Sequence, residues 1–173
     1  MPELLIRLKR HPDRTASLTC IRRDGSRTWQ RQRGQIGLVF PPHDLTHYAV
    51  EATLGFRHGF YGLIADGWDI SDFARPWRRG PIPAEAQTVE LIVGFFDAER
   101  RNGSSWTESE FNDHARRYVA ARRASRSGAG VQVPALTAAQ LERVRASRAE
   151  LLRQWSVIGA GECMELEFQR GGP

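Results

Sequence analysis

Two histidines and a glutamate recur at intervals of four residues in the stretch "PPHDLTHYAVEATLG", which runs from Pro41 to Gly55: His43, His47 and Glu51. Side chains four residues apart lie on one face of an α-helix. Imidazole nitrogens at that spacing can both reach one divalent ion at about 2.0–2.1 Å, as in the zinc helix of H-E-x-x-H proteases. The spacing therefore predicts a site for Zn²⁺ or another divalent metal ion on this helix.

The residue after the first histidine is Asp44, where those proteases carry a glutamate. Aspartate is one methylene shorter, so the pattern does not predict a protease. In a metal-dependent hydrolysis, Asp44 or another acid would handle the proton that water loses, and Asp44 is the catalytic candidate that we name. The alternative is a non-catalytic binding or assembly protein with structural histidines, in which Asp44 only complements the helix dipole.

Glu51 is the nearby carboxylate that shares the four-residue spacing of the two histidines. Eight residues separate it from His43, which is a rise of about 12 Å along a helix and a rotation of roughly 80°. Glu51 therefore either reaches the ion with its long side chain or accepts a hydrogen bond from the far ring nitrogen of His47. We place it with His43 and His47 in the metal group. A further ligand would come from another element, and the sequence does not rank the candidates His58, Asp66, Asp97 and His114.

The segment "PPHDLTHYAVEATLGFRHGFYGLIADGW" resembles uncharacterised bacterial proteins that share a Pro-His-Asp-Leu-x-His-x-x-Val-Glu run followed by a Gly-Phe-x-Gly segment. The shorter His-Asp-x-x-His pattern is similar to that of a ubiquinone-biosynthesis accessory family proposed to bind zinc. In that family a glutamate follows the second histidine after eleven intervening residues, whereas this chain has Gly59 there. The resemblance implies a zinc-type site and covers about thirty residues.

Length and composition are those of a soluble globular protein. The chain has 173 residues, of which 40% are hydrophobic and 26% charged, with no apolar run near the roughly 20 needed to cross a bilayer. One domain spanning residues 1–173 and a cytoplasmic location are expected, because the N-terminus lacks the pattern of a secretion signal. Cys20 and Cys163 are too far apart for a zinc knuckle and are interpreted as small buried hydrophobic residues.

The net charge of +5 comes almost wholly from arginine, since Lys9 is the sole lysine. Such uniform use of arginine is typical of GC-rich bacterial genomes. The arginines are scattered in pairs and accompany no nucleic-acid-reading module, so a nucleic-acid partner is not expected. A phosphate loop, a dinucleotide fingerprint and a nucleophile elbow are also absent from the sequence. The expected partner is an unidentified small molecule or protein, and the sequence does not fix the oligomeric state.

Period-two alternation at both ends of the chain predicts a sheet. The stretch "ELLIRLKR" alternates, and "ASLTCIRRDGSRTWQRQR" places Asp24-Gly25 between two alternating arms, which is a hairpin signal. Near the C-terminus, "CMELEFQR" alternates Met164, Leu166 and Phe168 with glutamates. We expect Leu166 and Phe168 to face the same core as Leu5 or Ile6.

Helical patterns fill the middle of the chain. Besides the histidine helix, expected to begin at Pro41 and to end at Gly55, helices are predicted in residues 83–103, 107–123 and 137–159, with a short helix from about Gly62. The prediction is an α+β fold in which a small antiparallel sheet packs against four or five helices; an all-helical domain with a fraying hairpin is the alternative.

Two segments lack a regular pattern. The stretch from Ala124 to Pro134 is expected to be a mobile loop. In "RPWRRGPIP", three prolines prevent regular structure around Trp77, and arginines flank it. Trp77 either packs on its own domain or serves as an exposed anchor for a partner.

Overall fold

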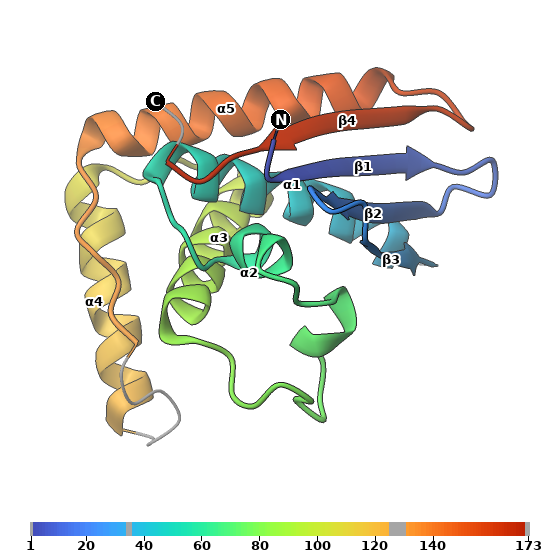
Figure 1. Cartoon of the computed structure of the whole chain (residues 1–173). Helices are drawn as coiled ribbons and strands as arrows, with labels where there is room; N and C mark the ends of the chain where they lie inside the picture. Colours follow the sequence, from blue (N-terminus) through green and yellow to red (C-terminus); the bar gives the residue numbers. More distant parts are fainter. Residues whose placement is uncertain (1, 34–35, 125–130, 172–173) are drawn as a thin grey trace.

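A computed structural model describes residues 2–33, 36–124 and 131–171 of the chain. Within these residues, four strands form one antiparallel sheet in the order β3-β2-β1-β4 (Figure 1). The strands are β1 (Leu4–Arg10), β2 (Ala16–Arg22), β3 (Arg27–Gln32) and β4 (Cys163–Phe168). The C-terminal strand thus lies beside the N-terminal strand, and the predicted α+β class with its two-ended sheet is confirmed.

The register of β1 and β4 follows from their alternation. Leu4 pairs with Phe168 and Ile6 with Leu166. Leu4, Ile6 and Phe168 are fully buried, and Leu166 packs against the same core. The predicted common core of the two chain ends is confirmed, with Ile6 rather than Leu5 on the buried face, because successive side chains of a strand point to opposite faces.

The helices are α1 (Ile36–Leu54), α2 (Phe60–Ala65), the 3₁₀ helix η1 (Ile70–Phe73), α3 (Ala84–Asn102), α4 (Glu108–Ala124) and α5 (Ala138–Val157). Helix α1 packs against α3 and α5 and also contacts β2 and β3. It therefore lies between the sheet and the other helices, where its side chains become buried. The sheet rules out the all-helical alternative.

Helix α1 begins earlier than the sequence predicts. It starts at Ile36, so Pro41 and Pro42 lie inside it rather than in its first turn. The φ angle that proline imposes is compatible with a helix, but each interior proline removes one N–H donor and its ring crowds the carbonyl group four residues earlier. Its C-terminal end is as predicted, since Gly55 follows with a φ of +73°, a conformation that favours glycine.

The predicted capping residues are confirmed for the last two helices. Thr107 and Glu110 exchange the hydrogen bonds of a capping box, as do Thr137 and Gln140. The predicted mobile loop falls largely on residues 125–130, which lie outside the described residues.

The two cysteines differ in their surroundings. Cys20 is buried, as predicted, but Cys163 is exposed, so the prediction was wrong for that residue. Cys163 occupies the first position of β4, on the face of the strand opposite to Met164, and therefore points to solvent.

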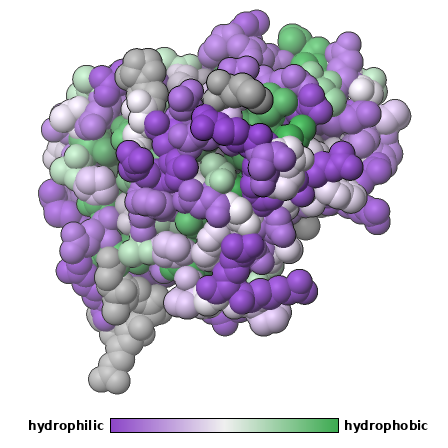
Figure 2. Space-filling model, viewed as in Figure 1, coloured by the Kyte–Doolittle hydropathy of each residue, from purple (hydrophilic) through white to green (hydrophobic). Residues whose placement is uncertain are grey.

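The surface toward the viewer is mostly hydrophilic, with hydrophobic residues only in small patches (Figure 2). Among the residues that the structure describes, no helix is both long and apolar enough to cross a membrane.

Candidate metal centre

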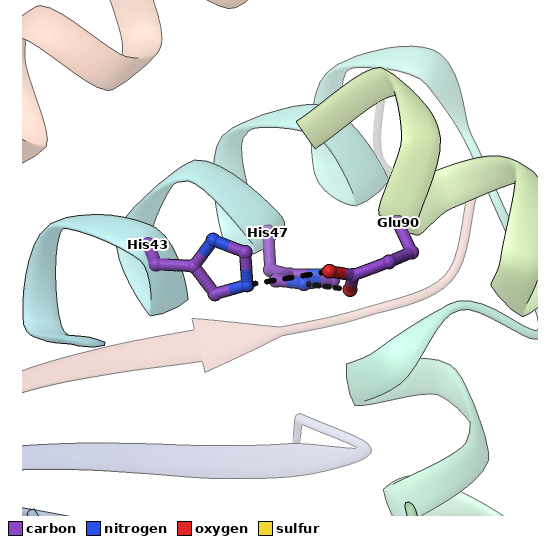
Figure 3. Close-up of side chains that lie close together, drawn as sticks. All are labelled: His43, His47 and Glu90. Atoms are coloured by element: carbon purple, nitrogen blue, oxygen red, sulfur yellow. Dashed lines mark hydrogen bonds and ion pairs between the residues drawn. The ribbon is translucent and has the colours of Figure 1, made fainter. Parts of the chain in front are cut away.

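His43 and His47 lie one turn apart on α1, and Glu90 reaches them from α3 (Figure 3). Oε2 of Glu90 lies 3.0 Å from Nε2 of His47, and Oε1 lies 3.8 Å from Nε2 of His43. One potential ligand atom from each residue lies within 4.8 Å of the others. In the described part of the chain, this is the one group of three or more His, Cys, Asp or Glu side chains with that proximity.

These separations are close to, but partly longer than, those that one small divalent ion requires. Two ligands that each lie 2.0–2.1 Å from an ion are about 2.9–3.4 Å apart in octahedral or tetrahedral geometry. The contact between His47 and Glu90 is already in that range, but the other separations reach up to 4.8 Å, so side chains must move toward one another to hold an ion. The Glu90 side chain is 60% exposed and has room to move. The three residues could therefore hold a metal ion.

Each imidazole also contacts a second carboxylate through its other ring nitrogen. Nδ1 of His43 lies 2.8 Å from Oδ2 of Asp97, and Nδ1 of His47 lies 3.4 Å from Oε1 of Glu51. Burial of Asp97 would raise its pKa, but the hydrogen bond from His43, the charges of His43 and Arg100 and the hydrogen bond from Thr46 together lower the pKa. An ionised carboxylate on Nδ1 fixes the ring and leaves Nε2 as the metal-binding atom. Both histidines are thus oriented with Nε2 toward Glu90.

Glu51 is held behind His47, away from the side that faces Glu90. It is 1% exposed and accepts hydrogen bonds from the backbone N–H groups of Tyr61, at 3.0 Å, and Gly62, at 3.2 Å. A Cβ atom at Gly59 would come within 2.5 Å of its carboxylate, so only glycine fits there. Of the two roles predicted for Glu51, the structure places it where it can orient His47, and the carboxylate beside both Nε2 atoms is Glu90.

His47 carries a strongly perturbed acid–base equilibrium. Burial alone would lower its pKa, but the hydrogen bonds to Glu51 and Glu90 outweigh burial and raise the pKa to about 10. The imidazole of the metal-free protein is therefore protonated at neutral pH and donates to both carboxylates. A metal ion at Nε2 must replace that proton.

Asp44 directly follows His43 in the chain and is almost completely buried. Nε2 of Gln32 donates a hydrogen bond to its Oδ2 at 2.6 Å. Burial raises the pKa of Asp44 to about 6, although the hydrogen bond from Gln32 opposes the shift. Asp44 and the two histidines line the same cleft.

This cleft has a volume of about 780 Å³. Its polar part contains His43, His47 and Glu90, and its apolar part is formed mainly by Phe40, Phe60, Ile70, Phe73, Ile82 and Ala86. Trp77 also lines the cleft and keeps an exposed fraction of 41%. The segment around Trp77 therefore borders the candidate metal centre.

Three of the other four candidate ligands lie away from this cluster. His58 is paired with Glu85, Asp66 with Arg170, and His114 packs on Trp106, while Asp97 touches His43 only through Nδ1. Sequence reasoning missed Glu90. A signal was present, because Glu90 and Asp97 flank an apolar stretch, lie seven residues, or about two turns, apart on one helix and so share one face.

Comparisons of the chain with family models, curated proteins and solved structures find no match. The function must therefore be argued from the site itself.

Proposed function

We propose that the protein is a metal-dependent hydrolase in which His43, His47 and Glu90 hold a Zn²⁺-like ion. The observation that carries this proposal is the paired orientation of the two imidazoles. Each has Nδ1 against a carboxylate, Asp97 or Glu51, and Nε2 toward Glu90. That arrangement recurs around metal-binding histidines, where the outer carboxylate sets the tautomer and the ring direction.

Three protein ligands beside a cleft favour catalysis over a purely structural site. Structural zinc sites are usually closed by four protein ligands, whereas catalytic sites keep a position for water or substrate. An ion held by these residues would polarise a carbonyl group and make water easier to deprotonate. The reaction is hydrolysis, in which the water oxygen bonds to the carbonyl carbon and the bond to the leaving group breaks.

Asp44 is the proposed proton carrier in that reaction. It accepts a proton from the attacking water and passes it to the leaving group. Its pKa of about 6 supports the role, because a general base works best when its pKa lies near the working pH. The alternative role of Asp44 at the start of a helix is not supported, since α1 begins eight residues earlier.

A non-catalytic function remains the second candidate, and one observation favours it. The protonated His47 forms ion pairs with Glu51 and Glu90 without any metal. In that case the cluster stabilises the packing of α1 on α3.

Metal analysis of the purified, untagged protein separates the two candidates. We expect about one zinc ion per chain in the wild type and in His58→Ala, and none in His47→Ala. His58 is a suitable control because it is half exposed and lies outside the cluster. Equal metal content in all three proteins would refute the proposed site.

Activity is tested with a panel of carboxylic esters and amides. Asp44→Asn should retain its zinc but lose about 10²–10⁴-fold in kcat, the range expected for removal of a general base. Full activity of Asp44→Asn would reject its role as the proton carrier.

A further inference from the structure

The cleft beside the candidate metal centre combines an apolar wall with a cationic edge. A volume of about 780 Å³ falls within the ~300–1,000 Å³ typical of small-molecule sites. The side chains of Phe60, Phe73 and Ile82 form part of the wall, and Arg75 and Arg122 lie at its border. The cleft therefore suits a small molecule with an apolar body.

Arg75 is presented to the cleft in a defined position. Its guanidinium carbon lies 4.7 Å from the centre of the Trp77 ring, and both residues line the cleft. No carboxylate pairs with Arg75 in the ranges 2–33, 36–124 and 131–171. Stacking uses the face of the guanidinium and leaves the N–H donors at its edge available for an anion.

The charges in the cleft favour an anionic ligand. The acidic side chains that line it, Asp44 and Glu90, are already bonded to Gln32 and His47. Arg75, which lines the same cleft, has no carboxylate partner in the described part of the chain. A ligand with one negative group would balance its charge.

We propose that the cleft binds small apolar carboxylic acids through Arg75, and that such acids carry the bond that is hydrolysed. The claim that these acids are hydrolysed rests on the proposed function, whereas the claim that they bind through Arg75 does not. The planar guanidinium edge matches a carboxylate with two parallel hydrogen bonds. The apolar body of the ligand then lies against Phe60 and Phe73, which places its other end near the histidines.

The test uses 4-phenylbutyrate and its neutral analogue 4-phenylbutyramide, with binding to the zinc-loaded protein followed by NMR titration. We expect the acid to bind about tenfold more tightly, as is typical of one charge-assisted hydrogen-bonded pair at a partly exposed site. Arg75→Gln should remove this preference. Arg78→Gln is the matched control, because Arg78 is an exposed neighbour that does not line the cleft.

A carboxylate could also bind zinc directly, so the titrations are repeated on wild-type protein stripped of metal with a chelator. A preference for the acid that persists there and still depends on Arg75 supports the inference, even if metal analysis refutes the hydrolase. Equal binding of the two probes, no binding of either, or equal effects of Arg75→Gln and Arg78→Gln would overturn it. Tighter binding of 3-phenylpropyl phosphate than of the acid would overturn the assignment to carboxylates.

Discussion

Helix α3 contributes to two clusters of charged side chains. In one of them, the negative charges are fully matched by cations and hydrogen-bond donors of the protein, and in the other they are not. At its C-terminal end, Glu99 is fully buried against Arg145, whose side chain is 14% exposed. Two nitrogens of Arg145 donate to Glu99, and so does the backbone N–H of Trp106. The charge of Glu99 is matched by that of Arg145, and the donors of Arg145 and Trp106 reach its carboxylate. We call this cluster the closed cluster.

The cluster at the middle of α3 is open and rich in acids. Glu51, Glu90 and Asp97 surround two histidines, and Asp97 has one further cation, Arg100, at 3.7 Å. His43 is 24% exposed and faces the cleft together with Glu90. Without a metal ion, the cations beside these carboxylates are Arg100 and protonated histidine. The difference indicates that the first cluster stabilises the fold, whereas the second could hold a cation.

The largest expected effect concerns stability and the closed cluster. Replacing Arg145 with Ala leaves the Glu99 carboxylate buried without its counter-charge, which should lower the free energy of unfolding by about 3–5 kcal/mol. Urea denaturation in the presence of a chelator measures the change. The matched variant in the open cluster is Glu90→Gln, whose exposed side chain should change stability by less than about 1 kcal/mol.

The comparison between the clusters would fail if Glu90→Gln destabilised the metal-free protein as much as Arg145→Ala does. The open cluster would then also be a structural unit, and the non-catalytic alternative would be favoured.

The sequence predicted the sheet and most helix ends because those features depend on local patterns. Alternation in "CMELEFQR" indicates both a strand and its buried face, and Thr137 with Gln140 indicates a helix start. The start of α1 was wrong because proline at an interior position is less favourable but not forbidden, and packing of α1 against α3, α5 and the sheet compensates for it.

The site was predictable only as far as it lies on one helix. His43, His47 and Glu51 share α1, so their spacing could be interpreted. Glu90 and Asp97 join them through the packing of α3 on α1, and no local rule states which two helices pack together. The role of Glu51 depends likewise on the backbone N–H groups of Tyr61 and Gly62, which a turn brings back to it.

A smaller effect, on zinc affinity, is expected when the carboxylates that contact Nδ1 of the two histidines are replaced. Asp97→Asn and Glu51→Gln should each lower zinc affinity by about 10–100-fold, the usual range for residues that orient a metal-binding histidine. Competition with a chromophoric chelator measures the affinity. Glu99→Gln lies on the same helix but in the closed cluster, and should leave the affinity unchanged if it folds. A loss as large as that of His47→Ala in either variant would mean that Asp97 or Glu51 binds the ion directly.

The smallest expected effect is the change in zinc affinity per pH unit. It tests whether a proton and the metal ion compete for Nε2 of His47. The pKa of His47 in the folded, metal-free protein is about 10, above the ordinary value of 6.5. The stabilising ion pairs of His47 are therefore fully present below about pH 6.5 and are lost as the pH rises toward 10.

Zinc affinity changes with pH in the opposite direction, because the ion must displace the proton of His47. Between pH 6 and pH 8 the zinc affinity should rise about tenfold per pH unit, beyond any change in the zinc itself. Calorimetry in two buffers with different protonation enthalpies should count about one proton released from His47 per ion bound. An affinity that does not change with pH, with no proton released, would mean that zinc binds elsewhere and that the open cluster is satisfied by its own protonated histidine.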